Sequence, residues 1–359
     1  MKKIICSLLA CTMLATTAFA DTLILTLDKA IETAKENNQQ LSVNDYKKAA
    51  AEISLKSAYI SQKDAKNAPV MFGDTATPLA KKGYYVTAAQ TNIKLLDLER
   101  EKINNNISYD VTEKYFNYIL TNKLVSIAES AEKLAKENLE IVNKYFELGM
   151  VPELEVKNAE AAVSKCTFTK ESYIRNRSLA AENLKISLNM KGDIDFNLTD
   201  SIESEQYTWD VDAEITAAAD TRYDIISLLE AYNLSKLNFE IVSIYNLSNT
   251  ANYNTAYSQM LESEYNYENN KRLIELSIRN SYNNILTCSD NLASAQNDYN
   301  IKKLEYDVAK IKYDVGSITN TQLTQTMNAL SASEVELENA KLASKLAVEK
   351  YKYEITAGL

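Results

Sequence analysis

The chain has 359 residues, of which 25% are charged, 6 are glycine, 3 are proline and none is histidine. This scarcity of helix breakers argues against a sheet protein with many turns and favours a few very long helices. The lack of histidine removes the commonest general base and metal ligand, and the formal net charge of −10 disfavours a nucleic-acid partner.

Residues 1–20 have the pattern of a secretory signal peptide. Lys2 and Lys3 precede an apolar run at 4–14, and Ala18-Phe19-Ala20 is a small-x-small cleavage site. The run is too short to cross roughly 30 Å of hydrocarbon. We therefore expect cleavage after Ala20, export to the cell envelope (periplasm or outer membrane), and a mature net charge of 37 − 49 = −12. A lipoprotein box at Leu8-Leu9-Ala10-Cys11 is the alternative, but it would leave a shorter apolar region.

The first half of the mature chain, residues 21–192, is predicted to contain three helical stretches. An extended lead at 21–25 precedes a helix at about 26–63, which a break near Asn37-Asn38 could interrupt. Residues 64–88 hold two prolines and two glycines and are expected to be irregular. From about 89 to 148 no breaker occurs, and apolar residues alternate steps of three and four, the 3.5-residue period of left-handed coiled coils. A third helix follows, to about 190.

The second half, residues 213–359, repeats this plan after a polar linker at 193–212. A helix is predicted at 213–245, a break at 246–256, a long helix at 257–315 and a last helix to the C-terminus. The long helix carries an apolar stripe that consists of Ile301, Leu304, Val308, Ile311 and Val315. The last helix carries another, which consists of Leu323, Leu330, Leu337 and Tyr351.

Each half contains one glycine between two long helical patterns, Gly149 and Gly316. Glycine suits the position just past a helix end because it accepts a positive φ without a steric penalty from Cβ. Pro152 follows the first glycine where a starting helix tolerates a missing N–H, and Thr319 can cap the helix after the second. We therefore predict two helical hairpins in tandem, with tips at 148–152 and 315–319.

Two cysteines, Cys166 and Cys288, remain after signal cleavage. In the hairpin arrangement they differ in height by roughly 16 Å along the helices. A disulfide needs Cα atoms within about 7 Å, so both are predicted to be free thiols.

These patterns resemble the TolC family of outer-membrane efflux proteins over nearly the whole mature chain. The resemblance rests on three features: the segment Thr26-Leu27-Asp28-Lys29-Ala30-Ile31 with the Asn37-Asn38 pair, the segment Ala219-Asp220-Thr221-Arg222-Tyr223-Asp224-Ile225, and the two aromatic-x-x-Gly tips. The resemblance implies an all-α fold of very long antiparallel coiled-coil helices in two tandem repeats. Three chains would then form a homotrimeric α-helical barrel.

The resemblance also implies a function as the exit duct of a tripartite efflux or type I secretion system. In such a system a periplasmic adaptor (membrane fusion) protein docks at the tips, and an inner-membrane ABC or RND transporter acts indirectly through it. Carried over by position, the docking residues are Leu148, Gly149, Met150, Val315, Gly316 and Ser317.

The sequence departs from the family pattern in two places. Where the family often has acidic residues at its pore constriction, this chain has Gln322 and Gln325, while Glu155 keeps an acid in the first repeat. We therefore expect weak cation block. The break at 246–256 is also too short for two of the family's membrane strands and a turn, whereas residues 64–88 could hold one poor hairpin, with Tyr84-Tyr85-Val86 on one arm. Three such hairpins make six strands, below the eight of the smallest known barrels, so β-barrel strands are predicted to be short or absent and membrane insertion stays open.

Two other function classes, an enzyme and a structural coiled coil, fit the sequence less well. No glycine-rich phosphate loop and no spaced cysteine cluster occurs, so neither an enzyme nor a cofactor is expected. A secreted structural coiled coil, a spacer without a channel, would explain the signal peptide and the periodicity but not the two matched tips.

Overall fold

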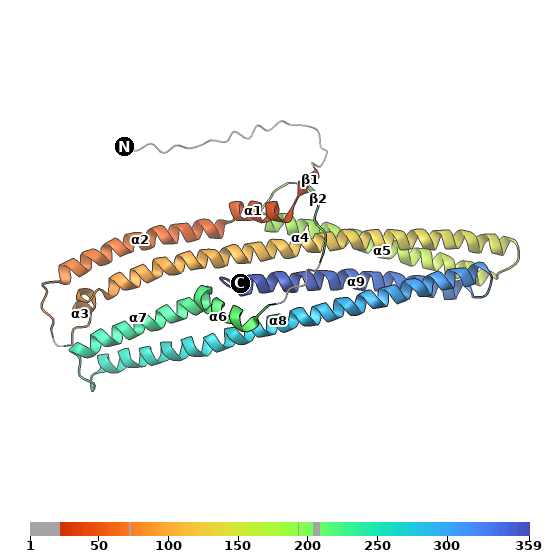
Figure 1. Cartoon of the computed structure of the whole chain (residues 1–359). Coiled ribbons are helices and arrows are strands. Elements are labelled where there is room, and N and C mark those ends of the chain that lie inside the picture. Colours follow the sequence, from red (N-terminus) through yellow and green to blue (C-terminus); the bar gives the residue numbers. More distant parts are fainter. Residues whose placement is uncertain (1–21, 72, 193, 204–208) are drawn as a thin grey trace, which may run out of the picture.

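The computed structural model describes residues 22–71, 73–192, 194–203 and 209–359, so the predicted signal peptide lies outside the described part. Its elements follow one another along an elongated helical bundle (Figure 1). They are β1 (Thr22–Leu25), α1 (Leu27–Asn37), α2 (Gln39–Ala65), α3 (Ala76–Lys81), α4 (Tyr84–Glu147), α5 (Glu153–Ser187), β2 (Asp195–Leu198), α6 (Val211–Thr221), α7 (Tyr223–Tyr245), α8 (Ala251–Asp314) and α9 (Asn320–Glu354). The predicted all-α fold class is confirmed.

Two very long helices, α4 and α8, form the frame of the bundle. Each has 64 residues, which corresponds to roughly 96 Å at 1.5 Å per residue. Helix α5 returns along α4 from the first tip, and α9 returns along α8 from the second. Both tips lie at the same end of the molecule, and both helix breaks, α2 to α4 and α7 to α8, lie at the opposite end (Figure 1).

The seam between helices explains the heptad spacing on α4. The row Ala128, Ala135 and Val142 is almost fully buried, and Val142 packs with Val156 and Ala159 of α5. The other apolar row on α4 starts at buried Leu120 and Leu124 but ends at exposed Ile141 and, just past the helix, Leu148. The single chain thus covers one seam completely and leaves the other partly open towards the tips.

The apolar stripes on α8 and α9 differ in their exposure to solvent. On α9, Leu323, Leu337 and Tyr351 are buried, as expected for a helix packed into the bundle. On α8 every member of the stripe is exposed: Ile301, Leu304, Val308, Ile311, Val315. The α8 stripe therefore has no partner within one chain.

A small belt crosses the middle of the bundle. Strands β1 and β2 pair in parallel, with Leu23 opposite Phe196 and Leu25 opposite Leu198. The fully buried Tyr115 of α4 donates a hydrogen bond from its hydroxyl to the carbonyl of Leu25 (2.8 Å). The belt is thereby fixed to the centre of the first long helix.

Some predicted boundaries were wrong. Residues 64–88 were expected to be irregular, but they contain α3, and Tyr84-Tyr85-Val86 begin α4 instead of forming an extended arm. Gly83 allows this because it precedes α4 at φ +78°, which turns the chain sharply after α3.

The helix predicted over 213–245 is also interrupted. Arg222 leaves the helical conformation between α6 and α7, with ψ 126°. Its guanidinium donates two hydrogen bonds to Asp224 (2.9 and 2.7 Å) and one to the carbonyl of Glu354 (2.7 Å). The break is thus stabilised by the C-terminal end of α9, a long-range contact with no local sequence signal.

The cysteine prediction is confirmed, since both thiols are free. Cys166 is buried on α5 and Cys288 is half-buried on α8. Burial raises the pKa of both thiols, so neither is primed as a nucleophilic thiolate.

Candidate functional site: the paired helical tips

The first tip closes α4 with a Schellman motif. The N–H of Met150 bonds to the carbonyl of Tyr145 (2.8 Å) and the N–H of Gly149 to that of Phe146 (2.9 Å). Gly149 adopts φ +72°, which a residue with a Cβ reaches only with strain. The tip therefore needs glycine for its backbone conformation.

The second tip repeats this motif atom for atom. The N–H of Ser317 bonds to the carbonyl of Lys312 (2.8 Å), the N–H of Gly316 bonds to that of Tyr313 (2.9 Å), and Gly316 has φ +73°. A capping box then starts α9, because the Thr319 hydroxyl accepts from the N–H of Gln322 (3.3 Å) and the Gln322 amide oxygen accepts from the N–H of Thr319 (2.9 Å).

The two tips lie against each other although 167 residues separate their glycines. The rings of Tyr145 and Tyr313 are 6.4 Å apart, and the Thr321 hydroxyl donates to the Glu155 carboxylate at 3.4 Å. A groove of about 540 Å³ runs between the tips; it is lined by Tyr145, Met150, Val151, Pro152, Glu155, Tyr313, Asp314, Val315, Gly316, Ile318, Thr319 and Asn320.

The surroundings of Tyr313 in the groove favour its neutral phenol. Burial raises the pKa of the Tyr313 phenol, and the neighbouring Tyr145, Glu155 and Asp314 raise it further. Tyr313 is thus an un-ionised, packed ring at physiological pH.

The predicted docking residues form the outermost surface of this end. Leu148, Met150 and Val315 are 71%, 67% and 74% exposed, and Ser317 is also exposed. An added Cβ on Gly149 or Gly316 would meet no atom within 4 Å, so both glycines also face open space. The structure brings all six predicted docking residues to one end of the molecule.

Of the three residues predicted for the pore constriction, Glu155 and Gln322 lie on the first turns of α5 and α9, and Gln325 lies on the second turn of α9. Gln325 is exposed, and Glu155 is half-buried at the junction of the tips. Gln322 is exposed, but its amide oxygen is used by the capping box. Local helix capping is therefore one structural reason for a glutamine at this position.

Sequence reasoning missed the residues that join the tips. Tyr145 was assigned to a helical stripe and Tyr313 to the second aromatic-x-x-Gly tip, without a partner for either ring; their positions four and three residues before the two glycines do not by themselves predict that they meet. Asn320 is buried in the groove wall, and its side-chain oxygen has no hydrogen-bond partner in the described part of the chain.

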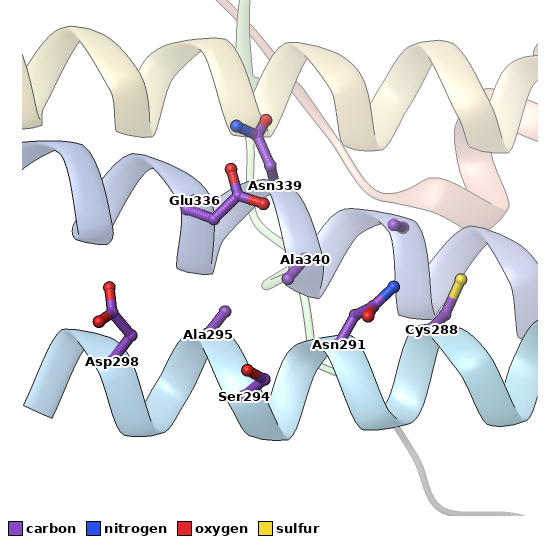
Figure 2. A pocket seen from close by; sticks show the side chains of 9 residues that line it. Cys288, Asn291, Ser294, Ala295, Asp298, Glu336, Asn339 and Ala340 are labelled. Carbon is purple, nitrogen blue, oxygen red and sulfur yellow. The ribbon is translucent and has the colours of Figure 1, made fainter.

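A second hollow lies between α8 and α9, halfway along the bundle (Figure 2). Figure 2 shows Asp298 and Glu336 on facing helices, small residues between them, and Cys288 towards one end. No three metal-binding side chains converge among the described residues. With neither an activated thiol nor a histidine, this hollow has no evident catalytic chemistry.

The family model described as "Outer membrane efflux protein" matches residues 233–350. Residues 233–350 are an outer membrane efflux protein domain. The predicted resemblance to the TolC family is confirmed, and because this family consists of efflux channels, so is the prediction that the chain is not an enzyme. No curated protein matches the chain.

The matched domain covers α8, most of α9 and the end of α7; solved structures extend the likeness to the whole fold. A CusC structure, from work on its folding and transmembrane channel formation, is 14% identical with a TM-score of 0.75, and 96% of each chain is covered. The Campylobacter jejuni CmeC outer membrane channel is 16% identical with a TM-score of 0.67, covering 93% of this chain and 86% of that one. The OprN outer-membrane channel is 12% identical with a TM-score of 0.77, covering 92% and 90%. At these identities the likeness to solved structures establishes the fold alone.

None of the helices in the described ranges has the length and apolarity needed to cross a membrane.

Proposed function

We propose that this chain is the exit duct of a tripartite efflux or type I secretion system. It would form a homotrimeric periplasmic channel that docks an adaptor protein at its tips, with an ABC or RND transporter of the inner membrane acting through that adaptor. The observation that carries the proposal is the pair of matching tips, which present exposed Leu148, Met150 and Val315 around one groove.

The tip end suits the docking of a helical hairpin. Its groove combines aromatic and aliphatic walls with a few polar groups, the usual composition of a surface that receives an amphipathic helix. The two Schellman motifs and the capping box fix the backbone, so little conformational entropy is lost on binding. Exposed apolar residues on such a fixed rim are typical of an interaction site.

The trimer is supported by the exposed stripe on α8. Its five apolar residues recur every three or four positions, the spacing of a coiled-coil seam, and none is covered within one chain. A neighbouring copy would bury this stripe and complete a closed wall around a water-filled passage. Because Gln322 and Gln325 are neutral, the selectivity of the channel at this constriction would depend on the width of the pore more than on its charge.

Docking is tested by capture of a periplasmic adaptor in cells, with a photo-crosslinking residue at position 150 or 317 and identification by mass spectrometry. Gly149→Trp and Gly316→Trp should abolish capture because the indole fills the space in front of the tip. Gly149→Ala and Gly316→Ala are matched controls, since they impose the same backbone strain without the bulk, and they should retain capture. Equal capture by Trp and Ala variants would contradict docking at the tips.

Assembly is tested by light scattering and negative-stain imaging of the purified protein. A trimer with a central hole supports the duct. A filament or a dimer would favour the alternative, a structural coiled-coil spacer of the cell envelope, and would overturn the proposal.

A further inference from the structure

Strand β2 and the residue after it contain a pattern that exported proteins use for the attachment of a glycan. Asn197-Leu198-Thr199 fits the acceptor pattern Asn-x-Ser/Thr, in which x is any residue except proline. The same pattern starts at four other asparagines of the chain, which are Asn106, Asn176, Asn233 and Asn246. A pattern of three residues recurs by chance, so the structure around each asparagine decides which of the five is available.

The other four asparagines are held by helices. Asn106, Asn176 and Asn233 are exposed, but they lie inside α4, α5 and α7. In a helix the side chains of residues i and i+2 do not face each other. An enzyme that contacts both the asparagine amide and the hydroxyl two positions later would therefore have to unwind these helices. Asn246 ends α7 and is only 5% exposed, and its amide donates to the carbonyl of Val242 (3.1 Å).

Asn197 lies in an extended segment and is exposed. Successive side chains of a strand point to opposite faces, so residues i and i+2 share a face. Phe196 packs inward at 5% exposure, whereas Asn197 and Thr199 are both exposed. Ile24, which lies opposite Asn197 on β1, is 68% exposed, so this face of the pair of strands is open to solvent. The amide and the hydroxyl of this site can thus be reached together in the folded chain.

A second sequence feature separates this site from the other four. Asp195 places an acidic residue two positions before Asn197. The residues at the corresponding position of the other sites are uncharged; they are Asn104, Ile174, Ala231 and Ile244. An acid at a fixed spacing offers an enzyme a charge-assisted hydrogen bond beside the asparagine. Exposure, extended backbone and this acid coincide at one of the five sites.

We propose that Asn197 is the acceptor of an N-linked oligosaccharide that is added after export of the chain. The co-reactant is an oligosaccharide carried on a polyprenyl diphosphate lipid, and the catalyst is an oligosaccharyltransferase of the cell envelope. The Nδ2 atom of Asn197 forms a bond to the anomeric carbon of the first sugar, while the bond from this carbon to the diphosphate oxygen breaks. The diphosphate leaves with the bonding electron pair, and the amide nitrogen gives one proton to a base of the transferase.

The position of Asn197 keeps a glycan away from the surfaces proposed for docking and assembly. The pair of strands lies at the middle of the bundle, whereas both tips lie at one end (Figure 1). The apolar stripe of α8 begins at Ile301, 15 residues before Gly316, and so lies within roughly 22 Å of the second tip. The proposal therefore requires export, which the signal peptide pattern at 1–20 predicts, but neither adaptor docking nor a trimer.

The test is glycopeptide mapping of the chain purified from the envelope of the cells that make it. Trypsin releases the peptide from Gly192 to Arg222, which contains Asn197 and none of the other four sites. This peptide should carry the mass of one oligosaccharide. Asn197→Gln and Thr199→Ala should each abolish the modification, whereas Thr199→Ser should retain it because serine also fits the acceptor pattern.

The matched controls are Asn176→Gln and Asn233→Gln, which remove exposed sites inside α5 and α7. Both should leave the mass of the glycosylated chain unchanged, and circular dichroism should show equal helicity in all variants. An unmodified Asn197 in the native chain, a glycan at Asn176 or Asn233, or modification that survives Thr199→Ala would each overturn the proposal. Adaptor capture at the tips would stand in any of these cases.

Discussion

At the scale of single residues, one buried carboxylate holds the first hairpin together along its shaft. Glu132 of α4 is only 7% exposed. It accepts from the Lys170 ammonium (2.7 Å) and the Thr167 hydroxyl (2.7 Å) of α5, and it pairs with Lys136 at 3.1 Å. A charge this deeply buried is tolerated because three donors surround it.

These partners, Lys170 first, lower the pKa of Glu132 to about 2. A carboxyl whose pKa is lower in the folded than in the unfolded state stabilises the fold above its unfolded pKa, and this stabilisation is lost as the pH falls. The contribution of Glu132 should therefore be complete above about pH 5 and disappear as the pH approaches 2.

Glu132→Gln should accordingly destabilise the protein at neutral pH and much less in acid. The measurement is urea unfolding followed by circular dichroism across this pH range. Glu137→Gln is the control, since Glu137 lies on the same helix, is exposed and is 3.9 Å from its lysine partner. A pH-independent effect of Glu132→Gln would show that packing, and not charge, is what the substitution removes.

At the scale of elements, the two hairpins use one turn design with different starts for the returning helix. Both α4 and α8 end in a Schellman motif around a left-handed glycine. Helix α9 starts with a side-chain capping box, whereas α5 starts after Pro152 with no side-chain cap and relies on Glu153 and Glu155 in its first turn.

Gly149→Ala and Gly316→Ala should each cost about 1–2 kcal/mol of stability through backbone strain alone. Steric clash adds nothing, because an added Cβ meets no atom within 4 Å at either position. Gly149→Asn and Gly316→Asn should cost less, since asparagine visits the left-handed region more readily. Thermal unfolding of the four variants measures this order, and equal stability of Ala and Asn variants would contradict it.

The tips and long helices were predictable because their signals are local. A glycine between two heptad patterns identifies a hairpin tip without knowledge of any other part of the chain, and both tips were placed correctly. The break at Arg222 was missed because one of its partners, the carbonyl of Glu354, lies 132 residues further along the chain, although the other, Asp224, is local. The contact between Tyr145 and Tyr313 was missed for the same reason, since only the packing of two repeats brings these rings together.

At the scale of the whole molecule, the chain leaves an apolar face that only another molecule can cover. The α8 stripe from Ile301 to Val315 is exposed along its full length, while in the α9 stripe Leu323, Leu337 and Tyr351 are buried and Leu330 is half-buried. An exposed seam of this regularity contributes little to the stability of the isolated chain, because burial of apolar surface is what stabilises.

Leu304→Gln/Ile311→Gln should therefore reduce the assembled mass while leaving the helicity of each chain unchanged. Both side chains are 65% exposed in the single chain, so their replacement removes little internal packing. Lys303→Gln/Lys310→Gln, on the same helix, is the control and should assemble normally. Light scattering of the purified variants measures the mass, and an unchanged mass in the leucine–isoleucine variant would contradict a role for this face in assembly.

The belt at the middle of the bundle sets an order of events during biosynthesis. Strand β1 comes at the start of the described chain, but its partner β2 ends only at Leu198, and the N–H of Leu27 bonds to an Asp200 carboxylate 173 positions later. A chain made from its N-terminus therefore holds an unpaired strand edge until nearly the whole first repeat has emerged. Strands β1 and β2 can pair only when synthesis of the first repeat is nearly complete. A nascent chain stalled before Asp195 would therefore expose the unpaired edge of β1 to incorrect pairing with other chains.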